Sequence, residues 1–496
     1  MTEVTFGIVH IRDGVEVLPA AGAEMSVIGI LATAPDADED VFPLDEPVYF
    51  TTDDTTFTSK IGSTGTLKDA IEGIAAQLDD VQRSARVIVV RVDEENTVAA
   101  TIANMIGSSV DKTGMHAFRK APAKIGFSPR LIIAPGYTQQ QLFGVTGHGS
   151  ITGGTGGTNG TFALGFTGGT GTAATGTFTV AGGALTAINI TSPGGYSVAP
   201  TAFSFAASTG LTGAASSIQT AKVANGVATA LPAVCGPLKA RAILDPPATD
   251  RQAFIDWRET LASDSLIAGP ACNVKVTAAD GSIVEKPSSP RIAGLAVKVD
   301  NESEGRPFRS WANRPILGIV GVSRDIDFSL VDGDTEGQDI LSRNGSIIVR
   351  GESGVESSIS DGGFYFVGTD TLSEDPLWRF YHVCRGRDWL ELGQIKAEKP
   401  YLGVQNITLA VAMAIAETMR SQLGLAKARG EIIDYRVGFE PDKNTPEEIR
   451  LGNLQMMFKA EEPPVLRKLR ISSRRYRPAL ENLVAAISSQ INSLAA

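Results

Sequence analysis

The glycine-rich stretch at residues 151–180 has the residue types of a phosphate-binding loop; it reads ITGGTGGTNGTFALGFTGGTGTAATGTFTV. A Walker loop places Lys and then Ser or Thr directly after its last glycine. A dinucleotide fingerprint lies between a buried strand and a helix. Here GTGTAA at residues 169–174 is followed by TGTFTV, which is strand-like in composition. Nucleotide binding at this stretch is therefore disfavoured.

The acidic run VDGDTEGQDI begins like a calcium-binding loop. Asp332, Asp334, Glu336 and Gly337 stand at its first, third, fifth and sixth positions. The twelfth position of such a loop needs a bidentate Glu, and this chain has Arg343 there. A solvated acidic turn is the favoured interpretation.

Cysteine and histidine side chains are too scattered to form a metal site or a disulfide framework. Cys235, Cys272 and Cys384 form no CxxC pair, and the four histidines do not pair with them at ligand spacing. Buried thiols are the favoured interpretation, and disulfides between subunits of an assembled particle are the alternative. No GxSxG elbow or other nucleophile motif is present. We therefore predict no catalytic, cofactor-binding or metal site, and no enzyme activity.

Composition points to a globular, mildly acidic protein. The 496 residues are 43% hydrophobic and carry a net charge of −11, which argues against general coating of nucleic acid. The first residues, MTEVTFGIVHIRDG, lack the pattern of an export signal, and no segment reaches the roughly 18 consecutive apolar residues of a membrane span. We expect no direct nucleic-acid partner, no membrane insertion, and folding in a cytoplasm.

Two short apolar runs, residues 26–35 and 86–92, have the composition of strands buried on both faces of a sheet. A helical pattern lies between them at residues 64–80, and strand, helix, strand is the unit of a parallel sheet. The same alternation resumes after residue 222, ending in a helix that begins near Pro290. The predicted fold class is multidomain α/β with a parallel-sheet core.

Residues 131–221 contain no Asp, Glu, Lys or Arg, a break in composition that marks an insertion. Apolar residues recur there with period two between glycine-rich turns, which predicts a small antiparallel β domain. The predicted domains are an N-terminal arm at 1–22, the core at 23–141 plus 223–374, the insertion at 142–222, and a C-terminal α+β domain at 375–496. Stabilising the exterior of an assembly is the favoured role of the insertion; glycan binding is the alternative.

Both ends of the chain have the pattern of strands. The C-terminal domain is predicted to contain a strand and two helices within residues 377–432, two antiparallel strands near 451–462 and 465–473, and a last helix. The terminal strands could dock on their own domain or be donated to a neighbouring sheet, and the basic run near the C-terminus could instead be a solvated edge or contact an acidic surface. The candidate arm residues are Val4, Phe6, Ile8, Val15, Val17, Leu466, Lys468, Leu469, Arg470 and Ile471.

These pieces together resemble the tail sheath protein of contractile-tailed bacteriophages and their pyocin relatives. The pieces that carry the resemblance run in chain order: GVEVLPA, VIGILATAPDAD, TGTLKDAIEGI, RVIVVRV, RLIIAPGYT, SPRIAGLAVKVDNE, ILGIVGVSRDIDF, GSIIVR and WRFYHVCRGRDWL. The resemblance implies a subunit that polymerises helically around a tail tube and contracts from a metastable extended state to drive the tube through the host envelope. It also implies a core like a subtilisin fold without the active site.

The resemblance further implies partners and surfaces. The partners are further copies of the chain, the tail tube protein, and the baseplate and tail terminator proteins. The location is the virion tail, assembled in the host cytoplasm. The helix from about residue 406 to 423 would face the tube, with Glu417, Arg420, Lys427 and Arg429 as candidates. A surface adhesin or array protein with a glycan-binding β module is the alternative function, and a degenerate hydrolase is a third.

Overall fold

The structure of the protein is a computed structural model that describes residues 24–81 and 83–494. The predicted N-terminal arm, with Val4, Phe6, Ile8, Val15 and Val17, lies outside the described residues and stays a prediction. The chain divides into two compact units, Met1–Pro463 and Pro464–Ala496. Each unit is described by itself.

A six-stranded, mainly parallel sheet forms the centre of the first unit, with strand order β15-β14-β4-β1-β3-β2. All neighbouring pairs are parallel except β2 and β3 at one edge. The strands are β1 (Ile28–Thr33), β2 (Pro47–Thr51), β3 (Arg86–Val92), β4 (Leu131–Ile133), β14 (Arg241–Leu244) and β15 (Ile267–Ala268). Their apolar side chains are buried on both faces, as the uninterrupted runs in the sequence predict.

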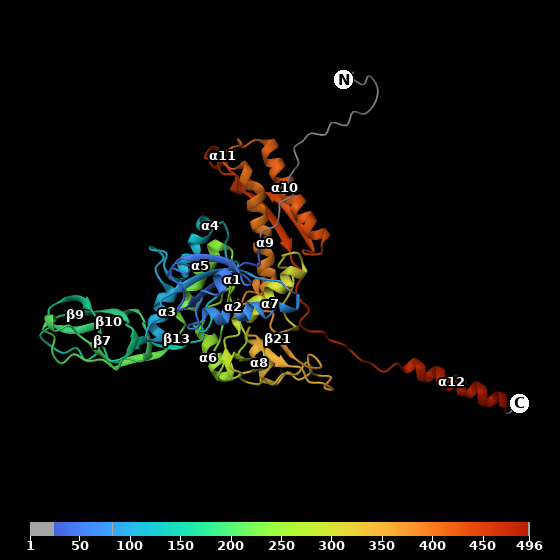
Figure 1. Ribbon diagram of the computed structural model, residues 1–496, viewed down its shortest axis with the longest axis horizontal. Helices are drawn as coiled ribbons and strands as arrows, with labels where there is room; N and C mark the ends of the chain where they lie inside the picture. The colour runs from blue at the N-terminus through green and yellow to red at the C-terminus, as the bar shows by residue number, and fades with distance from the viewer. Residues whose placement is uncertain (1–23, 82, 495–496) are drawn as a thin grey trace, which may run out of the picture. The chain divides into compact units, whose positions relative to one another are not determined.

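Helices surround this sheet (Figure 1), and their burial differs: Ser289–Glu302 is buried almost throughout, whereas Thr55–Thr58 has no buried residue. In α2 the buried residues include Leu67, Ile71 and Ile74, which share one side of the helix, and α2 packs against α7. The helices of this part are α1 (Thr55–Thr58), α2 (Leu67–Ala75), α3 (Val98–Ile106), α4 (Ala121–Lys124), α5 (Gly226–Leu238), α6 (Arg251–Thr260), α7 (Ser289–Glu302) and α8 (Glu336–Ser342). The prediction of a mixed α/β fold with several sheets is confirmed. The subtilisin-like assignment and the domain boundaries stay predictions.

Two small sheets complete the core. One has the order β17-β16-β19 and the other β18-β21-β20. Their strands are β16 (Val274–Thr277), β17 (Ile283–Lys286), β18 (Arg314–Pro315), β19 (Gly321–Val322), β20 (Ile347–Arg350) and β21 (Phe364–Val367).

Antiparallel strands fill the uncharged insertion, and β9 and β10 lie apart from the core helices in Figure 1. They form the sheets β13-β5-β11-β8, β10-β9-β6 and β12-β7 around a separate hydrophobic cluster that contains Phe178, Val180 and Tyr196. The strands are β5 (Leu142–His148), β6 (Gly160–Ala163), β7 (Gly165–Thr167), β8 (Thr170–Thr172), β9 (Thr175–Ala181), β10 (Ala184–Ser192), β11 (Gly195–Val198), β12 (Ala202–Ser204) and β13 (Ile218–Val223). The first and last of these strands pair with each other, so the insertion enters and leaves the core through adjacent strands.

The part after residue 374 begins with a helix, not with the predicted strand. Pro376–Trp378 is a 3-10 turn, and α9 spans Tyr381–Glu398. Residues 377–432 contain two helices and no strand, so the two predicted helices are confirmed and the strand predicted there is wrong. Tyr381, Cys384, Arg385 and Asp388 all lie buried at helical spacing, and the two charged members of this face hide its periodicity in the sequence.

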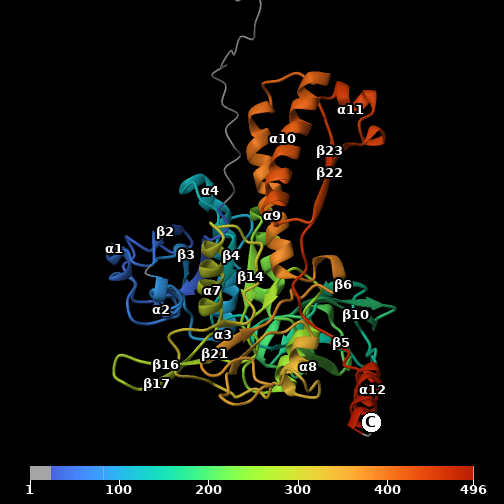
Figure 2. The ribbon, with the colours of Figure 1, turned by 90° about the vertical axis from the view of Figure 1, so that its right-hand side faces the viewer.

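A second helix and a two-stranded sheet follow α9 (Figure 2). These are α10 (Leu409–Ala428), β22 (Asp434–Phe439), α11 (Pro446–Arg450) and β23 (Met456–Glu461). Of these, α10, β22 and β23 share a hydrophobic cluster with α9 that includes Trp389, Leu423 and Met25.

The second unit contains α12 (Arg477–Leu494), which confirms the predicted last helix. The half-buried strand predicted at 465–473 is absent, because residues 464–476 form no regular element and all but Val465 are exposed. A strand needs a partner for its backbone hydrogen bonds, and no described strand pairs with this segment.

Candidate assembly surfaces

The C-terminal segment, residues 464–476, exposes apolar side chains that a strand in a folded protein would normally bury. Leu466, Leu469 and Ile471 are exposed, the last of them by 82%. Lys468 and Arg470 alternate with Leu469 and Ile471 and are exposed as well. In an extended conformation the two types would point to opposite faces, leaving an apolar and a cationic side.

The β22–β23 sheet offers edges on which such a segment could pair. The two strands are antiparallel over their full length, from Asp434 opposite Glu461 to Phe439 opposite Met456. Within the described residues no third strand joins them. A two-stranded sheet is marginal by itself, and an open edge exposes a row of unpaired backbone groups.

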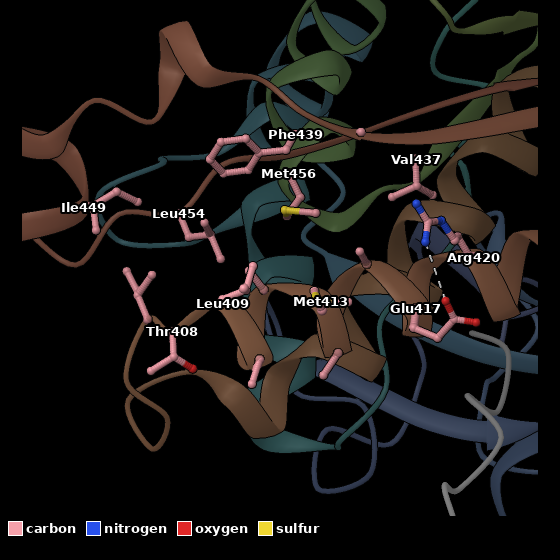
Figure 3. A pocket seen from close by; sticks show the side chains of 16 residues that line it. Thr408, Leu409, Met413, Glu417, Arg420, Val437, Phe439, Ile449, Leu454 and Met456 are labelled. Carbon is pink, nitrogen blue, oxygen red and sulfur yellow. Dashed lines mark ion pairs between the residues drawn. The ribbon is translucent and has the colours of Figure 1, made fainter.

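An apolar groove of about 860 Å³ lies between α10 and the ends of β22 and β23. Figure 3 shows Leu409 and Met413 of α10 facing Phe439 and Met456 across it. Leu409 is 78% exposed and Met413 is 63% exposed. Large apolar side chains gathered in one exposed hollow indicate an interaction surface.

The four candidates for the tube-facing surface do not all lie on one side of α10. Glu417 and Arg420 line the apolar groove, and their Oε2 and Nη1 atoms are 3.7 Å apart. Lys427 donates a 2.7 Å hydrogen bond to Asp434, and this bond lowers the pKa of that carboxyl group. Arg429 is exposed at the C-cap of α10. Glu417, Arg420 and Lys427 follow one side of the helix, which Arg429 does not share.

Buried ion pairs tie α9 to the α/β core, a feature that the sequence reading missed. Arg385 of α9 donates two hydrogen bonds to Asp300 of α7, at 2.9 Å and 2.6 Å. Their side chains are 0% and 1% exposed. Arg241 of β14 donates from Nε to Asp388 of α9 at 2.8 Å. Burial raises the pKa of both carboxyl groups, and the arginines oppose that rise.

The three thiols considered for disulfides between subunits are all free and buried. Burial raises the pKa of Cys235 and Cys272 to about 12 and that of Cys384 to about 11. A buried thiol with a raised pKa is inert towards exchange. This arrangement favours structural thiols, and the disulfides stay a prediction that needs these residues to become accessible.

The carboxyl edge of the parallel sheet is where ligands bind in open α/β folds. Here Asp245 follows β14 and accepts hydrogen bonds from Ser289 Oγ at 2.6 Å and from the Ser289 backbone N–H at 2.8 Å. Thr138 Oγ1 accepts a further bond from the Asp245 backbone N–H. Burial raises the pKa of Asp245. The buried polar groups at this edge therefore bind one another, and they hold the start of α7 against the sheet.

No protein-family model matches the chain. The tail sheath protein of Escherichia phage P2 is 23% identical over 97% of this chain and 98% of its own length. The chain is similar to tail sheath proteins. A putative prophage major tail sheath protein of Pseudomonas aeruginosa is 28% identical over 48% of this chain and 58% of its own length. The major tail sheath protein of Serratia phage KSP20 is 36% identical over 29% of this chain and 36% of its own length.

Solved sheath structures share the fold. The contracted helical sheath of the anti-feeding prophage has a TM-score of 0.56 at 13% identity, covering 96% of this chain and 100% of the other. The contracted PVC sheath complex of an extracellular contractile injection system has a TM-score of 0.55 at 11% identity, covering 96% and 99%. The predicted resemblance to sheath proteins is confirmed. Among the described helices, none has the length and apolar character of a membrane span.

Proposed function

We propose that this chain is a structural subunit of a contractile tail sheath, which polymerises helically around a tail tube. The observation that carries the proposal is the similarity to the P2 tail sheath protein along almost the whole of both chains. The fold shared with two contracted sheaths supports it. The place of action is the virion tail, after assembly in the host cytoplasm.

Subunits join by exchanging terminal strands. Residues 465–472 of one copy add to an open edge of the β22–β23 sheet of the next, so that backbone hydrogen bonds supply the affinity. The exposed, alternating Leu469 and Ile471 support this assignment, as does the two-stranded sheet. The N-terminal residues 4–17 make the second exchange. Each contact joins two different surfaces, and such a contact generates a helical filament when it does not close.

Contraction rotates rigid bodies that stay linked through these strands. The buried pairs Arg385–Asp300 and Arg241–Asp388 join α9 to the core, which supports one body that moves without internal repacking. The extended sheath is metastable, and the larger interface of the contracted state releases free energy without a cofactor or an enzymatic step. The tube pushed through the host envelope contacts the α10 surface, and baseplate and terminator proteins bind the ends of the sheath.

Electron microscopy of the purified protein tests the proposal. We expect tubes or rings of uniform diameter from the full chain. Deletion of residues 1–12 or of residues 464–496 should abolish these polymers while leaving a folded monomer, as judged by circular dichroism. Normal tubes from either deletion would overturn the assignment of that arm. A full chain that stays monomeric at all concentrations, or binds glycans as a monomer, would favour the adhesin alternative.

A further inference from the structure

Helix α12 carries an apolar stripe that nothing in its own unit covers. Residues 480, 484, 487, 491 and 494 are apolar and follow the alternating four-and-three spacing of a coiled-coil seam, and Leu483 lies beside them. None of the 18 residues of the helix is buried. The opposite side is polar and includes Ser489, whereas Arg477, which is ion-paired with Glu481, lies at the N-terminal end of the stripe, seven residues before Val484. A narrow stripe of this kind favours docking on a protein surface.

The groove beside α10 is the complementary surface in this chain. Its lining is apolar at Leu409, Met413, Phe439 and Met456. The groove lies on the face of the β22–β23 sheet that α10 partly covers. Val437 of β22 lines the groove and is buried in a hydrophobic cluster that includes residues of α10. A strand added beside β22 would widen this face, and a second helix could then pack on it next to α10. Sheets commonly bury one face under a layer of helices in this way.

Chain order and charge favour α12 of a second copy as the occupant. The segment proposed to add to the sheet ends near Ser472, and α12 begins at Arg477, so the helix follows the strand after a short connection. Residues 431–462, some of which line the groove, contain eight acidic and four basic residues, and two of the acidic ones, Glu431 and Glu462, are buried in ion pairs. Residues 464–494 contain six basic residues and one acidic residue. The basic residues all lie at 467–477, so the attraction acts between this segment and the acidic region, and it brings α12, which follows the segment, to the same surface.

We infer that α12 of one copy docks its apolar stripe into the α10 groove of the next copy. The added strand and α12 of one copy then join β22, β23 and α10 of the next copy, so that a layer of strands packs against a layer of helices. The inference rests on the proposed strand exchange. Docking there covers Met413 and Glu417 and leaves Lys427 and Arg429 for contact with the tube.

Cross-linking between two different full-length variants tests this docking. One preparation carries Met413→Cys in the groove, and the other carries Ile487→Cys in the stripe. The two are mixed, allowed to polymerise and treated with a short bis-maleimide. The native thiols are buried and should react little. We expect a cross-linked pair of chains in the mixture and not in either variant alone. In a matched control, Ser489→Cys on the polar side of α12 should give about tenfold less product.

The outcomes separate this inference from the proposed function. Sheath polymers without the cross-link would overturn the docking and leave the sheath proposal intact. A cross-link within a chain that carries both cysteines, formed in dilute monomer, would show that α12 occupies its own groove and would overturn the inference. A cross-link without any polymer would support the docking and count against helical assembly.

A second variant checks the energetics. Met413→Glu should raise the concentration for half-maximal polymerisation about tenfold, roughly the effect of losing one buried apolar side chain. Met413 is largely exposed in the single chain, so the substitution should leave folding unchanged. An unchanged polymerisation curve would contradict the docking.

Discussion

Arg385 and Asp300 show how a single buried contact holds two parts of the chain together. Arg385 also donates to the carbonyl oxygen of Met25 at 2.9 Å, so it joins three segments. Substituting Arg385→Met should lower the free energy of unfolding by about 3–5 kcal/mol, because it leaves a buried carboxylate without its partner. Urea unfolding measures the loss. The exposed pair Arg314–Glu302 is the control, and Arg314→Met should cost only about 0.5 kcal/mol.

The same variant should show a pH dependence of known sign. Burial already raises the pKa of Asp300, and removing Arg385 raises it further. The folded variant then binds a proton more tightly than the unfolded chain. Its stability relative to the wild type should therefore fall as the pH rises from 4 to 8. An equal loss at both pH values would show that Asp300 is not the group left unpaired.

A separate prediction at the residue scale concerns the reactivity of the three cysteines. Cys235, Cys272 and Cys384 should resist alkylation in the folded chain and react together after denaturation, because burial disfavours the thiolate. Mass spectrometry after iodoacetamide treatment counts the labelled thiols. Non-reducing gels of intact particles extend the test, and a dimer band there would support the disulfide alternative.

At the scale of elements, the insertion is the part that should be removable. Its hydrophobic cluster is separate from the core, and β5 pairs with β13 through Gly144 opposite Ala221. Replacing residues 145–220 with Asn-Gly closes these strands as a hairpin. We expect a folded chain that still forms polymers, as seen by electron microscopy. Loss of polymers from a folded variant would show that the insertion takes part in assembly.

At the scale of the whole molecule, the uneven charge predicts how assembly responds to salt. The basic segment at residues 467–477 and the mildly acidic region at 431–462 attract each other across the proposed interface between copies. Raising the salt concentration from 0.05 to 0.5 M shortens the range of this attraction to a few ångström. The fraction of protein that sediments as polymer should fall. Charge reversal by Lys468→Glu and Arg470→Glu should reduce assembly at low salt and abolish the salt dependence.

The sequence by itself determined the parallel core and the resemblance to sheath proteins. Ile28–Thr33 and Arg86–Val92 are rich in apolar, β-branched residues, which is typical of buried strands. Pro290 indicates the start of the helix at Ser289–Glu302. These signals are local, so they can be recognised in the sequence without knowing which distant segments pack against the strands and the helix. The alternating pattern of the insertion is local in the same sense.

Only the tertiary structure decided which surfaces are open and which charges are buried. Arg385 and Asp388 of α9 are buried because they bind Asp300 and Arg241, partners more than 80 residues away in the chain, and no local pattern in the sequence indicates these pairs. Residues 465–472 have the pattern of a strand, but no described strand pairs with them. Burial and strand pairing depend on contacts between distant segments, and only folding brings those segments together.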